Sequence, residues 1–235
     1  PDSDGVRDAA HNEWNSYLSR IEIDGTDDEK TNFYTSFYHA LIQPNEISDV
    51  DGMYRNAADS GVKAGTGTFY STFSLWDTYR AAHPFYTLII PERVDGFVNS
   101  LIEQGEVQGF LPIWALWGKE NYCMIGNHGV SVIAEAYRKG FRGFDAERAF
   151  NIIKKTQTVS HPLKSNWEVY TKYGYFPTDL IKAESVSSTL ESVYDDYAAA
   201  DMAGRMGKEE DAAYFAKRAD YYKNLFDTET QFMRP

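Results

Sequence analysis

The stretch "TDDEKTNFYTSFYHALIQP", residues 26–44, contains the start, the apolar face and the end of one helix. Thr26 and Glu29 have the spacing of a capping box, in which each side chain binds a backbone amide of the first turn. Apolar residues follow at helical spacing: Phe33, Tyr34, Phe37, Tyr38 and Leu41. Pro44 has no amide hydrogen to donate and therefore marks the end of the helix. The stretch predicts an amphipathic α-helix.

The same period recurs along the chain and predicts a mainly α protein. Further helices are expected at 6–21, 75–88, 91–105, 127–139, 145–157, 187–206 and 209–226. The Gly-rich region 50–73 ends in alternating Thr, Phe and Tyr, which predicts a small β-hairpin. Segments 107–126 and 158–185 are aromatic-rich and punctuated by Gly and Pro, as is typical of ordered loops. Helices joined by such loops favour helix pairs packed side by side, in a solenoid or a closed ring.

Composition excludes several classes of function. The chain has 235 residues and a net charge of -12, so a nucleic-acid backbone would be repelled. No apolar run approaches the roughly 20 residues of a membrane span. Cys123 is the one cysteine, which excludes an intrachain disulfide. The sequence also lacks zinc-ligand spacing, a phosphate-binding loop and a serine nucleophile elbow.

The motif "SLWDTYR", residues 74–80, allows two interpretations. In the first, Ser74 and Asp77 form a capping box at a helix start. In the second, Asp77 accepts hydrogen bonds from sugar hydroxyls while Trp76 stacks on the apolar face of the sugar. Arg80 lies three residues after Asp77 and could pair with it in either case.

The segment "SVSSTLESVYDDYAAADMAGRMG", residues 185–207, concentrates carboxylates on a predicted helix. Glu191 and Asp195 are four residues apart and therefore share a face, where like charges destabilise a helix by roughly 0.2–0.5 kcal/mol. One interpretation is a solvated acidic face, with Glu191 capping Ser188. The other is an acidic stripe in a polar cavity, where carboxylates hold hydroxyls or a cation.

Two further features lie in and after the loop 107–126. His128 is near a predicted helix start, where a structural histidine and a site histidine are both consistent with the pattern. Trp114 and Trp117 accompany Glu120 in the loop, which is typical of buried packing and is also compatible with the wall of a sugar subsite.

Long motifs in this sequence resemble glycoside hydrolase family 92. They include "YSTFSLWDTYRAAHPFY", "GFLPIWALWGKENYCMIGNHGVSVIAEAYRKGF", "SSTLESVYDDYAAADMA" and "FDTETQFMRP", in the order expected of the family. The resemblance extends from Trp14 to Pro235. It implies a β-sandwich followed by an (α/α)6 barrel, of which residues 1–235 would be an incomplete part. The β-sandwich is expected upstream and the rest of the barrel downstream.

The resemblance also implies a function and a site. Members of the family are calcium-dependent, inverting exo-α-mannosidases, which release terminal mannose from α-mannosides such as the α-1,2-linked mannose of N-glycans or mannans. It implies that Asp77, in the Trp-Asp-Thr motif, binds the terminal mannose. The candidate substrate-binding residues are Trp76, Asp77, Arg80, His128, Glu191 and Asp195. The acid and base motifs of the family have no match here, so the catalytic residues and the calcium ligands are expected beyond Pro235.

The implied partner is an α-mannoside glycan, and the implied location is periplasmic, extracellular or at the cell surface of a bacterium. Self-association through the exposed surface of an incomplete barrel is a further expectation. Two alternatives stay open on the sequence alone. The chain could be a non-catalytic helical fragment that binds sugar or acts as a scaffold, or part of a different (α/α)6 carbohydrate-active enzyme.

Overall fold

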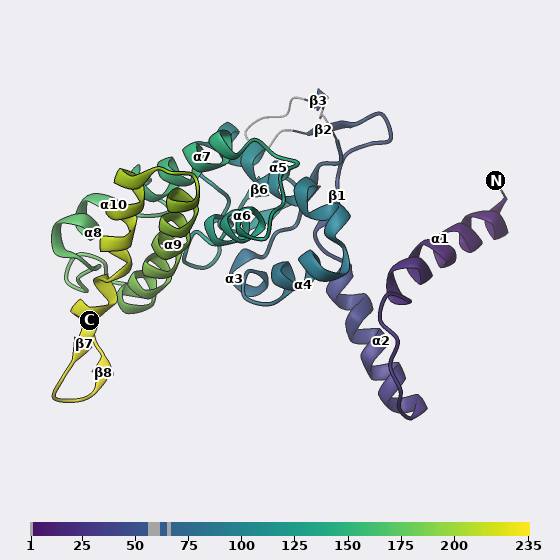
Figure 1. Ribbon diagram of the computed structural model, residues 1–235, viewed down its shortest axis with the longest axis horizontal. Coiled ribbons are helices and arrows are strands. Elements are labelled where there is room, and N and C mark those ends of the chain that lie inside the picture. The colour runs from purple at the N-terminus through teal and green to yellow at the C-terminus, as the bar shows by residue number, and fades with distance from the viewer. Residues whose placement is uncertain (1, 56–61, 65–66) are drawn as a thin grey trace.

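The computed structural model describes residues 2–55, 62–64 and 67–235 (Figure 1). Its helices are α1 (Ser3–Leu18), α2 (Asp27–Leu41), α3 (Leu75–Thr78), α4 (Ala82–Ile89), α5 (Pro91–Gln108), α6 (Gly129–Arg138), α7 (Ala146–Thr158), α8 (Trp167–Tyr173), α9 (Ser185–Arg205), α10 (Glu209–Ala219) and the 3₁₀ helix η1 (Tyr221–Leu225). Its strands are β1 (Asn45–Glu46), β2 (Met53–Arg55), β3 (Val62–Ala64), β4 (Tyr70–Ser71), β5 (Ala115–Leu116), β6 (Lys119–Glu120), β7 (Phe226–Asp227) and β8 (Phe232–Met233). The prediction of a mainly α fold is confirmed.

The start of α2 has the predicted capping box. The Glu29 amide donates to Thr26 Oγ1 over 3.3 Å, and the Thr26 amide donates to the Glu29 carboxylate over 2.8 Å. These bonds favour the ionised carboxylate and lower the pKa of Glu29. The helix ends at Leu41, shortly before Pro44.

Three helical predictions need correction. The expected helix 75–88 is divided into α3 and α4, since Pro84 lacks an amide hydrogen and is tolerated only in the first turn of a new helix. The expected helix 209–226 is likewise divided into α10 and η1. The expected loop 158–185 contains α8, which begins where Asn166 accepts from the Val169 amide and ends at the left-handed Gly174.

The hairpin expected in 50–73 is present in its described part. Strands β2 and β3 pair antiparallel, with Tyr54 opposite Lys63, and β1 pairs with β4. Residues 56–61 and 65–66 of this region lie outside the described residues. The loop 107–126 carries the short antiparallel pair β5 and β6, which the sequence did not predict.

The main hydrophobic core lies between helices α3 to α7, α9 and α10. Helix α5 presents a buried stripe to this core: Val94, Phe97, Val98, Leu101 and Ile102. Gly105 lets α5 approach α7 closely, since a Cβ there would lie 2.8 Å from Ile152 Cγ1. Burial of each large apolar side chain stabilises the fold by roughly 1.5–3 kcal/mol.

Figure 1 shows α1 and α2 projecting at one end of the molecule, with α8, α9, α10 and the β7–β8 hairpin at the other. Helix α1, described throughout its length, buries none of its residues. Helix α9 packs against α6, α7 and α10, and this position brings its carboxylates into the core. Among residues 2–55, 62–64 and 67–235, no helix combines the length and apolar character that crossing a membrane requires.

Candidate functional site

Helix α9 brings two carboxylates to one histidine at the start of α6. His128 Nδ1 lies 2.9 Å from Asp195 Oδ1, and its Nε2 lies 3.0 Å from Glu191 Oε2. His128 is 1% exposed and Asp195 is 0% exposed, whereas Glu191 is 18% exposed. Each ring nitrogen lies within ion-pair distance of a carboxylate oxygen, which favours the doubly protonated imidazolium, although only Nδ1 also has hydrogen-bond geometry among the described residues.

The charges of this cluster follow from its geometry. Burial lowers the pKa of His128, but the carboxylates of Asp195 and Glu191 oppose burial and raise this pKa to about 9. Burial raises the pKa of Glu191, yet its contacts with His128 and Trp76 leave it below the ordinary value. The cluster is therefore an ion-paired group at neutral pH, with protonated His128 between two carboxylates.

An aromatic wall adjoins the cluster. Trp76 Nε1 donates to Glu191 Oε1 over 3.2 Å, and the Tyr79 ring stacks on the His128 ring at 3.9 Å between centroids. The Arg80 guanidinium lies 4.9 Å from the Trp76 ring and 4.8 Å from the Tyr79 ring. Cation–π contacts of this kind contribute roughly 0.5–2 kcal/mol. Burial, assisted by Glu191, raises the pKa of Tyr79, so its hydroxyl stays protonated.

The Gly-Asn-His segment 126–128 fits closely around the imidazole. Gly126 has φ of +81°, and a Cβ there would lie 2.5 Å from His128 Nε2. The Asn127 amide donates to Asp195 Oδ2 over 2.6 Å, so the same carboxylate binds the backbone and the ring. The sequence analysis missed Gly126 and Asn127, although a glycine directly before Asn-His was a local signal for a left-handed turn.

The structure brings four of the six predicted site residues into direct contact: Trp76, His128, Glu191 and Asp195. Arg80 joins them through its stacking on Trp76, and it donates to the Trp76 carbonyl over 3.1 Å instead of pairing with Asp77. Asp77 is exposed on α3, one residue from Trp76.

Three interpretations of the sequence are wrong. Within the described residues, Ser74 makes no side-chain cap on α3, so Asp77 does not complete a capping box. Ser188 lies inside α9, which begins at Ser185, and Glu191 therefore does not cap it. The acidic stripe is not a solvated face, because Asp195 and Asp196 are both fully buried against partners from other helices.

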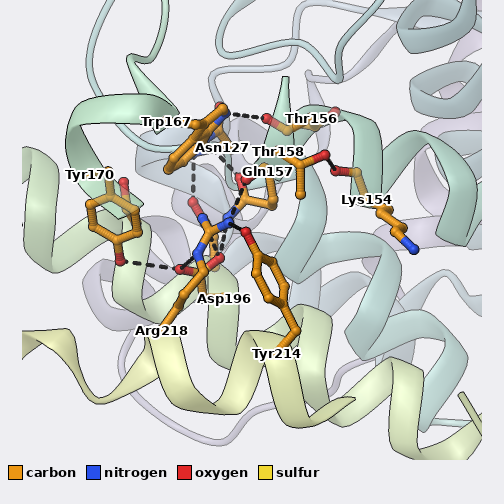
Figure 2. A network of polar contacts seen from close by, with 12 residues as sticks. Asn127, Lys154, Thr156, Gln157, Thr158, Trp167, Tyr170, Asp196, Tyr214 and Arg218 are labelled. Carbon is orange, nitrogen blue, oxygen red and sulfur yellow. Dashed lines mark hydrogen bonds and ion pairs between the residues drawn. The ribbon is translucent and has the colours of Figure 1, made fainter. Parts of the chain in front are cut away.

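A second buried network lies behind the first and surrounds Asp196 (Figure 2). Arg218 of α10 binds Asp196 through Nε at 3.0 Å and Nη2 at 2.9 Å. Tyr170 of α8 donates its hydroxyl to the same carboxylate over 3.1 Å. Burial raises the pKa of Asp196, and the Arg218 guanidinium opposes that rise. The sequence did not predict this partnership, since Arg218 lies 22 residues away with no local pattern linking the two.

Two residues of the aromatic wall, Tyr79 and Arg80, also line a cavity of about 320 Å³ between α4, α6 and α9, whereas the other five predicted site residues are not part of its lining. Its lining combines aromatic, charged and small residues, among them Tyr79, Arg80, Ser131, Glu135, Tyr194 and Asp201. Aromatic faces beside carboxylates and hydroxyls suit a ligand with apolar and hydroxylated surfaces, and a sugar has both. The volume is at the lower end of the range typical of small-molecule sites.

The described residues do not fit a calcium ion. In residues 2–55, 62–64 and 67–235, no group of three or more His, Cys, Asp or Glu side chains could hold a metal. Glu191 and Asp195 direct their oxygens to His128, Trp76 and the Asn127 amide.

Solved structures of other proteins resemble this chain over nearly its whole length. A solved family GH92 α-mannosidase from Bacteroides thetaiotaomicron is 40% identical, with a TM-score of 0.93 over 98% of this chain and 31% of its own. That enzyme has also been solved in complex with mannoimidazole. A family GH92 inverting mannosidase from the same bacterium is 32% identical, with a TM-score of 0.92 over 99% of this chain and 32% of its own.

An uncharacterized secreted glycosidase of Arthroderma benhamiae is 23% identical over 244 residues, which cover 96% of this chain and 27% of that protein. The chain thus spans about a third or less of the length of these relatives. Residues 1–235 match the model of the glycosyl hydrolase family 92 catalytic domain from end to end. With this match and two structures of the family at 40% and 32% identity, the chain belongs to glycoside hydrolase family 92.

Proposed function

We propose that the protein containing this chain is an α-mannosidase that releases terminal mannose from α-mannosides, such as the α-1,2-linked mannose of N-glycans or mannans. The observation that carries the proposal is the aromatic and charged cavity lined by Tyr79 and Arg80, in a chain whose similar solved structures are mannosidases. The complex of one of these enzymes with mannoimidazole supports a sugar ligand.

The candidate residues have distinct roles in this proposal. The exposed Asp77 carboxylate accepts hydrogen bonds from mannose hydroxyls, and Arg80 donates to them. Trp76 and Tyr79 offer ring faces to the apolar side of the sugar. The partly exposed carboxylate of Glu191 contacts the ligand. The same carboxylate accepts a hydrogen bond from Trp76 Nε1 and so fixes the indole ring. Asp195 and His128 are buried and act by holding Glu191 in place.

We infer a single-displacement mechanism with inversion of configuration. A general acid protonates the glycosidic oxygen while a general base activates water on the opposite face, with the two carboxyl groups roughly 6.5–9.5 Å apart. The acid and base motifs of the family have no match in residues 1–235. We therefore propose that parts of the protein outside this segment supply the acid, the base and the calcium ligands, and that they complete the (α/α)6 barrel. The β-sandwich domain is likewise proposed to lie upstream.

The test of this function is product analysis on the full-length protein. We expect mannose release from α-mannobiosides, with β-mannose as the first product seen by NMR. Binding without turnover would favour a non-catalytic sugar-binding module instead. Turnover of other glycosides or of uronates would favour a different (α/α)6 carbohydrate-active enzyme. Secretion to the periplasm, the medium or the cell surface is part of the proposal, supported by the secreted relative and tested by cell fractionation.

Asp77→Asn is the sharpest variant for this site. It exchanges an acceptor oxygen for a donor and removes the charge, which should lower kcat/KM by about 10–100-fold. The melting temperature should change little, because Asp77 is exposed. Ser74→Ala is the control and should leave both activity and stability near wild type. An Asp77→Asn enzyme with unchanged kcat/KM would remove Asp77 from the site.

We also propose that a polypeptide limited to residues 1–235 self-associates through the surface that it would bury in a complete barrel. Light scattering that finds only monomer at high concentration would exclude it.

A further inference from the structure

Two successive acids of α9, Asp195 and Asp196, are both fully buried, and they bind different parts of the molecule. Asp195 faces His128 and the Asn127 amide, at 2.9 Å and 2.6 Å. Asp196 faces Arg218 of α10, with which it forms a two-point ion pair. One peptide bond therefore joins the candidate site to a buried ion pair outside it.

Asn127 and Gln157 link the same two acids by a second route. The Asn127 side chain donates from Nδ2 to Gln157 Oε1 over 2.9 Å. Gln157 Nε2 then donates to Asp196 Oδ1 over 3.1 Å. Together with the Asn127–Asp195 bond, these contacts form a closed ring of four residues from α9, from the segment before α6 and from α7. We call it the amide ring; three of its members are labelled in Figure 2.

Chemistry fixes the direction of every bond in the amide ring. In its ionised form, which the Arg218 guanidinium favours, the Asp196 carboxylate can only accept, so the NH₂ of Gln157 faces it and the Gln157 oxygen faces Asn127. Asn127 then presents its NH₂ to Gln157, and its Oδ1 is a buried acceptor without a partner among the described residues. The ring therefore has one arrangement of donors and acceptors and no equivalent alternative.

Arg218 holds the far side of the amide ring. Its Nη1 donates to the Gln157 carbonyl over 2.7 Å while its Nε binds Asp196, so it contacts two ring members at once. Its guanidinium lies 4.9 Å from the Trp167 ring and 5.0 Å from the Tyr170 ring. Both residues of the ion pair are thereby held from several sides, and Asp196 has little freedom to move.

Stability alone is a weak reason for such an arrangement. Well-packed apolar residues in place of a buried ion pair are often neutral or even stabilising. The buried polar network adds one defined geometry, since each of its residues must form hydrogen bonds with its neighbours. That geometry ends at Asp195, which in turn contacts His128.

We propose that the amide ring is a positioning device, in which Gln157 and Asn127 transmit the fixed position of the Asp196–Arg218 pair to Asp195 and so set the orientation of His128 and Glu191. The proposal rests on the proposed function of the His128 cluster as part of a sugar site. Gln157 is then a positioning residue, because it contacts Asn127 and Asp196 and acts on Asp195, His128 and Glu191 only through them.

The test compares Gln157→Met with Thr156→Val in the full-length protein. Both residues are fully buried neighbours on α7, and both substitutions remove side-chain hydrogen bonds, but Thr156 Oγ1 contacts Leu111 and Ile152 and not the ring. The readout is the pKa of His128, measured by mass spectrometry from the pH dependence of hydrogen exchange at its ring carbon. Gln157→Met should lower this pKa by about one unit as Asp195 loosens from Nδ1. Thr156→Val should leave it unchanged.

Activity is the second readout. We expect kcat/KM on an α-mannobioside to fall about 10-fold in Gln157→Met and to stay at the wild-type value in Thr156→Val. If Gln157→Met does not fold, Asn127→Ala cuts the same side-chain link and should shift the pKa in the same way. A His128 pKa that moves in neither variant, or equally in Thr156→Val, overturns the proposal. Wild-type protein without mannosidase activity would overturn the proposed function instead, while the pKa comparison would still decide the positioning role.

Discussion

Gly126 is the residue on which the geometry around His128 depends most directly. A Cβ at this position would lie 2.5 Å from His128 Nε2 and 2.7 Å from its Cε1, and φ is +81°. Gly126→Ala should therefore both strain the backbone and displace the ring from Glu191. We expect a loss of unfolding free energy of about 2–4 kcal/mol, measured by urea denaturation.

Gly140→Ala is the matched control for this prediction. Its φ is +93°, but a Cβ there would meet no atom within 4 Å. It should cost only the backbone strain, about 1 kcal/mol. Equal losses in the two variants would show that the contact with His128 contributes nothing.

The raised pKa of His128 predicts a pH dependence of stability. A histidine with a pKa of about 9 when folded and about 6.5 when unfolded stabilises the fold fully below pH 6.5, and this contribution disappears as the pH rises to 9. His128→Gln should therefore cost more at pH 6 than at pH 9.5. The difference between the two costs should be on the order of 3 kcal/mol, measured by urea unfolding of both proteins at each pH.

Lys164 requires a parallel measurement because its protonation also changes between pH 6 and pH 9.5, and its effect on the unfolding free energy has the opposite sign to that of His128. Burial lowers its pKa to about 7, so it destabilises the fold below pH 7 and this penalty is relieved as the pH rises toward its unfolded value. Lys164→Met should thus stabilise the protein more at pH 6 than at pH 9.5.

For the His128 prediction, a His128→Gln cost in unfolding free energy that is the same at both pH values would contradict the ion-paired imidazolium.

At the scale of helices and strands, local signals predicted most of the fold. The capping box at Thr26 and the apolar period after it gave the limits of α2 to within a few residues. The seven-residue α8 was missed because it is too short to show a period, although Asn166 and Gly174 mark its ends. Local patterns could not show that Asp195 and Asp196 are buried, because their partners come from the segment before α6, from α7 and from α10.

Helix α7 allows a test of capping at an exposed helix start. Asp145 accepts from the amides of Glu147 and Arg148, and it precedes a helix whose apolar face is buried. Asp145→Ala should lower the unfolding free energy by about 1 kcal/mol, whereas Asp145→Asn keeps an acceptor and should be nearly neutral. Chemical denaturation of both variants provides the comparison, and an equal loss in the two would show that the charge, and not the cap, stabilises α7.

At the scale of the whole molecule, we predict that a polypeptide limited to residues 1–235 does not hydrolyse α-mannosides. The motivation is that the acid and base motifs of the family have no match in this segment. General acid–base assistance alone contributes about 10²–10⁴-fold to a rate, so turnover should fall below detection. Mannose release from an α-mannobioside with calcium present is the measurement, with the full-length protein as control. Comparable turnover by the two would place the catalytic carboxyl pair within the segment.

The burial of Asp195 and Asp196 toward different partners gives α9 a fixed rotational register. Each residue of an α-helix turns the next by about 100° and advances it by about 1.5 Å. One residue inserted between Glu191 and Asp195 would rotate both aspartates relative to Glu191. A shift of the helix that returned Asp195 and Asp196 to Asn127 and Arg218 would then carry Glu191 away from His128 and Trp76. The segments that precede and follow α9 can therefore vary in length during evolution or engineering, while the helix itself tolerates substitution far better than insertion or deletion.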